Sequence, residues 1–214
     1  MAHTARTMRR AADLIAEADP AFIPVIESSP LCTIGQKSQG DPFHALVVAI
    51  IGQQLSVRAA DTITERFHAH LGGAITPDRV LDVDHESMRA VGLSGAKTRT
   101  IRGLAEATHT GDLDLAALAV HEDNHHITGE LTKLWGIGRW TAEMFLMFTL
   151  HRLDVWPVGD LAMRKGWQQI HRARAKDIDP AKLDRLGWKF APYRSVAAWY
   201  CWRVIDEGNG SDTW

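Results

Sequence analysis

Asp160 closes a segment that reads Trp-Pro-Val-Gly-Asp and precedes a run of residues that favours a helix. At a helix N-terminus the helix dipole favours the ionised form of an aspartate. Such a carboxylate can stabilise a developing cation and can orient or deprotonate a water molecule. An aspartate before a helix is most often only an N-cap, so position alone favours a structural role for Asp160.

Residues 134–142 form a second informative segment, Leu-Trp-Gly-Ile-Gly-Arg-Trp-Thr-Ala. An amphipathic helix ends at Leu134, and another helix starts directly after two closely spaced glycines. Gly136 and Gly138 let the backbone turn sharply and approach another surface. The amides of this hairpin and of the next helix's first turn then point outward, which predicts a phosphate-binding site.

Residues 121–125 read His-Glu-Asp-Asn-His and match the zinc-protease pattern H-E-x-x-H. That pattern requires both imidazoles on one face of a helix. Aspartate and asparagine at the intervening positions favour the start of a helix instead. The pattern also needs a third metal ligand. The candidate, Glu143, lies in the segment after the hairpin, so no clear third ligand follows. A zinc hydrolase is therefore the less favoured alternative.

Positive charge and tryptophan are both concentrated late in the chain. The net charge is −2, yet residues 131–203 carry thirteen Lys and Arg against six Asp and Glu, and the remainder has a balance of −9. Seven of the eight tryptophans fall between Trp135 and Trp202. A basic block interleaved with flat aromatic side chains suits a surface that binds phosphates and stacks bases. For Trp135, Trp188 and Trp199, however, we expect packing in the core.

The composition is that of a soluble globular protein. The 214 residues are 45% hydrophobic and 23% charged, which suits one domain or two small, packed ones. The longest apolar run, residues 45–51, is far shorter than the roughly 20 residues of a membrane span. The first residues mix arginine with acidic side chains, unlike a secretory signal. Cys32 and Cys201 are too few for a disulfide framework or, alone, for an iron–sulfur cluster, so we expect a cytoplasmic protein.

Helical periodicity runs through nearly the whole chain and no segment alternates like a strand, so the predicted fold class is all-α. Buried or amphipathic helices are expected over 44–51, 141–150 and 196–205, with another beginning at Asp160. Capping residue types indicate further helix starts at Ser56, Thr76, Asp84 and Ser94.

The hairpin, followed by Trp-Pro-Val-Gly-Asp, resembles the helix-hairpin-helix DNA glycosylases that carry a Gly/Pro-rich loop and an aspartate. Two upstream segments match in order, Ile-Gly-Gln-Gln-Leu-Ser at 51–56 and Gly-Leu-Ser-Gly-Ala-Lys at 92–97. Within this superfamily the chain is most similar to the alkylbase enzymes of the 3-methyladenine DNA glycosylase II type. It resembles their short form, without the N-terminal sheet domain that bacterial members often have.

This resemblance implies two helical subdomains with the active-site cleft between them. Residues 41–158 would form a helical barrel that contains the helix-hairpin-helix motif at about 126–150. Residues 1–40 and 159–214 would pack together as the second subdomain.

The resemblance also implies roles for individual residues. Asp160 would be the catalytic carboxylate. The pocket for a flipped base would be lined by Trp140, Met144 and Trp202, although related bacterial enzymes have an aromatic residue at the Met144 position. Gln54 stands where the family places the residue that fills the gap left by the flipped base. Contacts with DNA are implied for Gln53, Gln54, Ser94, Lys97, Leu134, Gly136, Ile137, Gly138, Arg139 and Thr141.

The implied activity is that of a monofunctional DNA glycosylase of base excision repair. An alkylated purine already carries positive charge and leaves without a general acid, so one carboxylate suffices where ordinary glycosidases use two. Such a flat cation is attracted to indole rings. 3-Methyladenine, 7-methylguanine, 1-methyladenine and 3-methylcytosine all fit the resemblance. Bifunctional relatives have a lysine at the position of Trp140, and no lysine lies between Lys133 and Lys165, so the reaction would stop at an abasic site.

The implied partner is double-stranded DNA that contains alkylated bases, bound by a monomer without membrane contact. No cofactor or intrinsic metal is implied, apart from Na⁺ or K⁺ between a DNA phosphate and the carbonyls of Leu134 and Gly136. Replacing Gly136 or Gly138 by valine is expected to weaken DNA binding with a modest effect on the fold. A module that binds DNA without catalysis is the other alternative, and it leaves Asp160 and the tryptophan pair Trp140 and Trp202 without a role.

Overall fold

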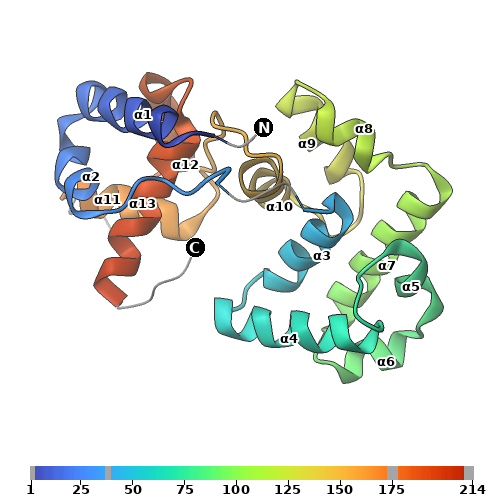
Figure 1. Ribbon diagram of the computed structural model, residues 1–214. Helices are drawn as coiled ribbons and strands as arrows, with labels where there is room; N and C mark the ends of the chain where they lie inside the picture. Colours follow the sequence, from blue (N-terminus) through green and yellow to red (C-terminus); the bar gives the residue numbers. More distant parts are fainter. Residues whose placement is uncertain (1–2, 37–39, 173–177, 210–214) are drawn as a thin grey trace. The chain divides into compact units, whose positions relative to one another are not determined.

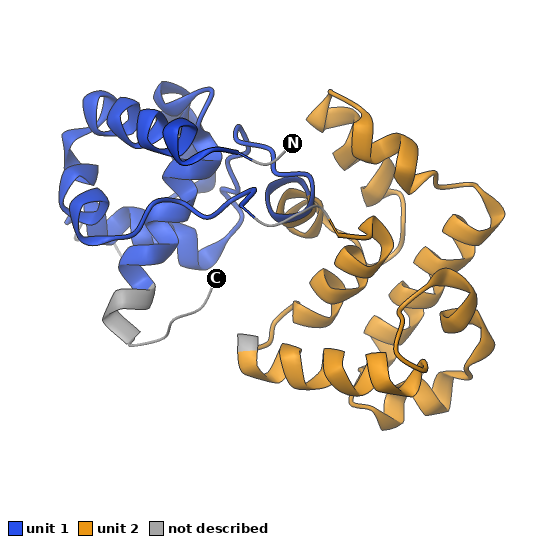
Figure 2. Cartoon of the chain, viewed as in Figure 1, with its two compact units in different colours: residues 1–38, 146–214 blue, residues 39–145 orange. Residues whose placement is uncertain are grey.

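The computed structural model describes residues 3–36, 40–172 and 178–209. Throughout these residues the regular elements are helices and none is a strand, which confirms the all-α prediction. The chain divides into two compact units, coloured separately in Figure 2: unit 1 comprises residues 1–38 and 146–214, and unit 2 comprises residues 39–145. None of the described helices is long and apolar enough to cross a membrane.

The helices of unit 2 are α3 (Pro42–Gly52), α4 (Val57–His70), α5 (Pro77–Asp82), α6 (His85–Ala90), α7 (Gly95–Thr110), α8 (Leu115–Val120), α9 (Asn124–Thr132) and α10 (Arg139–Met144) (Figure 1). Most of them begin at a residue whose side chain accepts a hydrogen bond from a first-turn amide. The four helix starts expected from the sequence are confirmed by such caps at Ser56, Thr76, Asp84 and Ser94.

Helix α3 lies at the centre of unit 2. Its side chains at Leu46, Val47 and Ile50 are fully buried, as expected for a helix that is apolar on every side. It packs against α4, α7, α8 and α10. Because the end of α3 is embedded in this core, the loop that follows it has a fixed position.

Unit 1 contains α1 (Ala5–Ala18), η1 (Pro20–Phe22), α2 (Ile23–Ser28), α11 (Leu161–Ile170), α12 (Pro180–Gly187), η3 (Trp188–Phe190) and α13 (Arg194–Asn209). A π-helix, η2 (Phe145–Thr149), continues the chain from α10, so the helix expected over 141–150 changes its geometry at Phe145. An aromatic cluster fills the core of this unit. The rings of Trp156, Trp167 and Phe22 pack around Phe190, and the centroids of neighbouring rings are 5.2–5.9 Å apart.

This core accounts for much of the late concentration of tryptophan. Trp156 and Trp167 are each 4% exposed, and Trp199 is 2% exposed, as expected. The expectation that Trp135 and Trp188 are core residues is wrong, because their side chains are 51% and 67% exposed. Each instead has an arginine guanidinium over its ring, at 4.1 Å for Trp135 and 5.6 Å for Trp188.

The division between the units follows Phe145, whereas the family resemblance implied a boundary after residue 158. The intervening residues belong to unit 1 because α12 and α13 hold them. Ser195 Oγ accepts a hydrogen bond from Val155 N (2.9 Å) and donates one to Arg152 O (2.7 Å). Trp156 Nε1 donates to Leu183 O (3.0 Å). These contacts anchor the loop that leads to Asp160.

Candidate functional site

The hairpin between α9 and α10 is fixed from inside unit 2. Ile137 is 3% exposed, and its amide donates to Leu134 O (3.1 Å). Gly136 has φ +84°, and a Cβ at this position would overlap Thr100 Oγ1 of α7. Both the backbone conformation and the lack of space therefore oppose a side chain at Gly136. Gly136→Val is therefore expected to destabilise the fold, rather than to have the modest effect expected from the sequence.

Gly138 differs from Gly136 in both respects. Its backbone is extended (φ −94°, ψ 172°), and an added Cβ would have no described atom within 4 Å. The fold of unit 2 thus has no need of a glycine here. Gly138 is also the N-cap of α10 and gives its first-turn amides no side-chain cap. A bare backbone beside such amides permits the close approach of an anion.

Gln53 connects the end of α3 to the hairpin. Its Nε2 donates to Gly136 O (3.2 Å) and to Thr141 Oγ1 (2.9 Å). Lys97, from the first turn of α7, donates from Nζ to Ile51 O and to Gln53 O, both at 2.8 Å. Burial lowers the pKa of Lys97 from its ordinary value. Gln53 and Lys97 therefore position the hairpin and the loop after α3, a role that the sequence did not reveal.

Gln54 follows directly and has φ +58°. A left-handed conformation in a residue with a side chain is strained, and such strain is found at functional positions. Gln54 and Leu55 are exposed at the tip of the loop. Since Lys97 and Gln53 fix the base of this loop, Gln54 projects from a rigid support.

Helix α10 carries the predicted pocket residues of unit 2. Trp140 is half-buried in its first turn, and Met144, one turn later, is 9% exposed. Arg139 is exposed and donates from Nε to Oε1 of the buried Glu143 (2.8 Å). The helix thus presents an aromatic side chain and an arginine directly after the two glycines.

Asp160 is the N-cap of α11 in unit 1, as expected. Its Oδ1 accepts hydrogen bonds from Met163 N (2.6 Å) and from Trp202 Nε1 (2.8 Å). Trp202 lies on α13 and is 5% exposed. Two of the predicted site residues of this unit are therefore brought together, with the indole acting as a hydrogen-bond donor to the carboxylate.

Phe148 is a neighbour of this pair that sequence reasoning missed. Its ring centroid lies 5.7 Å from that of Trp202, and it is half-buried. An aromatic residue in an apolar helical segment gives no local signal of its partner on α13.

The His-Glu-Asp-Asn-His segment does not form one helical face. His121 follows the end of α8 with extended backbone, and Asp123 is the N-cap of α9, where its Oδ1 accepts from His125 N (2.8 Å). His121 stacks on His126 with ring centroids 4.2 Å apart. The arrangement agrees with the helix start expected from Asp123 and Asn124 and removes the geometry that the zinc pattern requires. No group of three potential ligands is found among the described residues.

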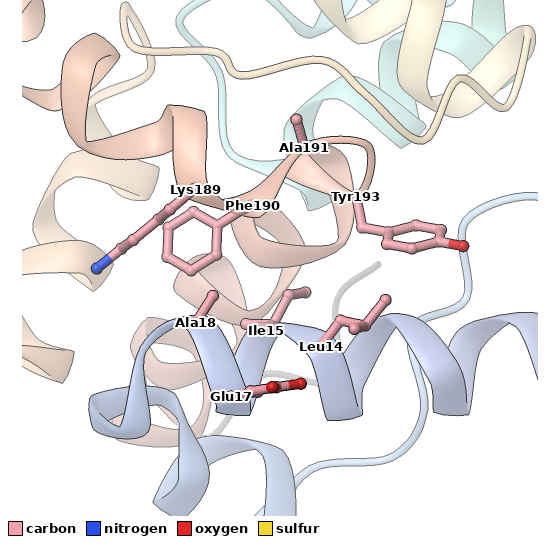
Figure 3. Close-up of a pocket in the computed structure, with 8 residues that line it drawn as sticks. All are labelled: Leu14, Ile15, Glu17, Ala18, Lys189, Phe190, Ala191 and Tyr193. Carbon is pink, nitrogen blue, oxygen red and sulfur yellow. The ribbon is translucent and has the colours of Figure 1, made fainter.

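A hollow of about 360 Å³ lies in unit 1 between α1 and the segment after α12 (Figure 3). Its lining is mostly apolar, from residues such as Leu14, Ile15, Phe190 and Tyr193, and also includes Glu17 and Lys189. It includes none of the residues that the sequence identified as site residues, and we assign it no part in the chemistry.

Known proteins match this chain over most of its length. Residues 47–192 match the family described as HhH-GPD superfamily base excision DNA repair protein. DNA-3-methyladenine glycosylase 1 of Schizosaccharomyces pombe is 38% identical over 168 residues, which cover 77% of this chain and 72% of that protein. A solved structure of the 3-methyladenine DNA glycosylase of Schizosaccharomyces pombe in complex with abasic DNA aligns with a TM-score of 0.85 and 32% identity, covering 92% of this chain and 97% of that chain. A DNA-3-methyladenine glycosidase from Bacillus halodurans aligns with a TM-score of 0.78 and 33% identity, covering 94% and 91%.

Proposed function

Because the chain belongs to the HhH-GPD superfamily of base excision DNA repair proteins, we propose that it is a monofunctional DNA glycosylase that releases alkylated, positively charged bases. The observation that carries the proposal is the Asp160–Trp202 pair, which holds a carboxylate at the start of α11. The names of the relatives, which refer to 3-methyladenine, support the substrate class.

In the proposed reaction, the bond between the base nitrogen and the sugar C1′ breaks, and its electron pair leaves with the base. This pair neutralises the positive charge of the alkylated ring, so no acid is needed. The sugar is left as an oxocarbenium-like cation. The Asp160 carboxylate stabilises this cation and orients or deprotonates the water that adds to C1′.

DNA is held through its backbone in this proposal. The bare backbone at Gly138 and the uncapped amides of α10 receive a phosphate, with Arg139 adjacent. Contacts of this type do not read base edges, so binding is independent of sequence and falls steeply with salt. The Leu134 carbonyl oxygen would help to coordinate a monovalent cation beside that phosphate. The Gly136 carbonyl is the other proposed ligand. Each of the two carbonyls already accepts one hydrogen bond, Leu134 O from Ile137 N and Gly136 O from Gln53 Nε2, and has a second lone pair for the cation.

The damaged base is flipped out of the duplex. Gln54, on its rigid loop, would fill the gap, and Trp140 would offer an aromatic face to the cationic base. Met144 and Trp202 complete the proposed lining, with Trp202 also orienting Asp160. We propose that the protein acts in this way as a cytoplasmic monomer.

Release of free base from methylated duplex DNA tests this function. We expect the purified protein to liberate 3-methyladenine or another cationic methylated base, detected by chromatography, and to leave intact abasic strands. Borohydride is expected to trap no covalent adduct, because Trp140 replaces the lysine of bifunctional relatives. DNA binding without release of any alkylated base would instead favour the non-catalytic alternative.

A further inference from the structure

A second hollow, of about 560 Å³, lies in unit 2 directly beside the hairpin. Its lining includes Arg99, Arg102, Gly103 and Glu106 of α7 and Leu134 and Trp135 of the hairpin. We call it the Arg99–Trp135 hollow. Of its lining residues, only Leu134 has a role assigned above, through its backbone carbonyl.

Trp135 and Arg99 form its most unusual feature. The indole is 51% exposed, and the guanidinium carbon of Arg99 lies 4.1 Å from the ring centroid. A stacked guanidinium keeps its edge donors available for bidentate binding of an anion, and its restricted motion reduces the entropy lost on binding. The exposed tryptophan therefore holds a preorganised cation.

The charges of the hollow favour an anion. Within the part of the chain that the structure describes, neither Arg99 nor Arg102 forms an ion pair. Arg102 is anchored by a hydrogen bond from Nη1 to Val83 O (2.6 Å). Glu106 lies two helical turns beyond Arg99 and is the acidic residue of the lining.

Gly103 is a second, independent feature. It lies inside α7, where glycine destabilises a helix relative to alanine. An added Cβ would have no described atom within 4 Å, so packing within the unit does not require this glycine. An open, side-chain-free stretch of helix beside two arginines suits the close approach of an extended ligand.

The position of the hollow identifies that ligand. Thr100, the neighbour of Arg99, packs under Gly136, so α7 and the hairpin form one rigid support. We propose that the Arg99–Trp135 hollow seats the sugar–phosphate backbone of the same DNA duplex that the hairpin binds, with Arg99 pairing to a phosphate. This inference rests on the proposed function and extends the DNA contact beyond the hairpin.

Binding of undamaged duplex DNA at several salt concentrations tests the proposal. Arg99→Ala is expected to weaken binding about fivefold to tenfold and to reduce the slope of log K against log salt by about 1. Arg66→Ala removes the same charge from an exposed position on α4, away from the hollow, and is expected to change neither quantity appreciably. Trp135→Ala is expected to weaken binding less, and adding it to Arg99→Ala should weaken binding little further, because both act through one contact.

Two more variants distinguish the effect of the hollow's charge from the effect of its open volume. Gly103→Leu fills the hollow without removing a charge and is expected to weaken binding, whereas Glu106→Gln is expected to tighten it. Melting curves check that each variant is folded. If Arg99→Ala and Gly103→Leu both bind as Arg66→Ala does while the wild type releases methylated base, the hollow is no DNA contact and the proposed function stands. If the wild type neither binds DNA nor releases base, both proposals are wrong.

Discussion

At the scale of single residues, the hydrogen bond between Trp202 Nε1 and Asp160 Oδ1 changes how both side chains are understood. Trp202 was expected only as a flat surface for a base. Only 5% of its surface is exposed, and its Nε1 donates to Asp160, so we propose that Trp202 also holds the carboxylate in one orientation. A donor to a charged acceptor typically contributes about 1.5–3 kcal/mol.

Trp202→Phe isolates that hydrogen bond, because phenylalanine keeps an aromatic ring and lacks the donor. We expect base release to slow by about tenfold to a hundredfold, from the loss of a hydrogen bond to a charged group. Trp199→Phe is the matched control, since Trp199 is also buried on α13 and its Nε1 has no partner in the described structure. Equal rates for the two variants would show that the donor at Trp202 has no role in the reaction.

Gln54 offers a separate test of strain. Gln54→Gly and Gln54→Ala both remove the side chain, but only glycine relieves the left-handed conformation at φ +58°. We expect the glycine variant to be more stable than the alanine variant by about 0.5–1 kcal/mol in chemical denaturation, because the greater chain entropy of unfolded glycine offsets part of the strain that is relieved. Both are expected to release base more slowly from well-paired lesions. A wild-type rate in both would remove Gln54 from the site.

At the scale of elements, the hairpin contains one glycine that the fold requires, Gly136, and one that it does not require, Gly138. Gly136→Ala is expected to lower the free energy of unfolding by about 2 kcal/mol, because the left-handed backbone and Thr100 both oppose a Cβ. Gly138→Val is expected to melt like the wild type yet bind duplex DNA about tenfold more weakly, through loss of charge-assisted contacts to a phosphate. Thermal melting and a DNA titration of both variants measure this contrast.

For comparison, Gly129→Ala changes a glycine on α9 whose added Cβ would also meet no described atom within 4 Å. It is expected to leave DNA affinity unchanged. Normal affinity in Gly138→Val would mean that no ligand approaches the backbone there.

Local signals predicted the helix starts, because a capping residue and the amide it accepts from lie within one turn, as at Ser56 and Ser94. They could not predict contacts between distant segments. Lys97 and Ile51 are separated by 46 residues, Gln53 and Gly136 by 83, and Trp202 and Asp160 by 42. The resemblance identified all of these residues except Ile51 as functional, but only the packing of the helices shows which of them position the others.

At the scale of the whole molecule, a partly buried cluster of charged side chains links three segments of unit 1. Asp19, at the end of α1, is 8% exposed and accepts from Lys189 Nζ and His171 Nε2, both at 2.8 Å. Burial raises the pKa of Asp19, but the hydrogen bonds from Lys189 and His171 outweigh it and lower the pKa below its ordinary value. The cluster joins α1, η3 and the end of α11, and nothing in the local sequence around Asp19 indicates it.

The pH dependence of stability follows from this shift. Since the unfolded state has the higher pKa at Asp19, it takes up a proton first as pH falls. The stabilisation is complete well above the ordinary aspartate pKa of about 3.9 and is lost as pH falls through the lowered, folded pKa. Asp19→Asn is expected to lower the free energy of unfolding by about 1–3 kcal/mol at neutral pH.

Melting temperatures measured across pH check this prediction. The difference between wild type and Asp19→Asn is expected to shrink in acid, whereas Glu17→Gln, at an exposed position on α1, should match the wild type throughout. A difference that persists undiminished at the lowest pH would assign the effect to packing rather than to the charge.

The role of Asp160 is tested most directly by Asp160→Asn. Asparagine keeps an Oδ1 that can accept from both Met163 N and Trp202 Nε1, so the cap and the link to α13 are retained. It removes the negative charge that stabilises the sugar cation in the proposed reaction, an effect worth about 3–4 kcal/mol, or two to three decades in rate. The measurement is single-turnover release of a methylated purine from duplex DNA, with a melting curve and a DNA titration of the same variant. We predict normal melting, normal affinity and a rate at least a hundredfold below the wild type. A folded, DNA-binding variant that keeps more than about a tenth of the wild-type rate would contradict the account and leave Asp160 as a helix cap.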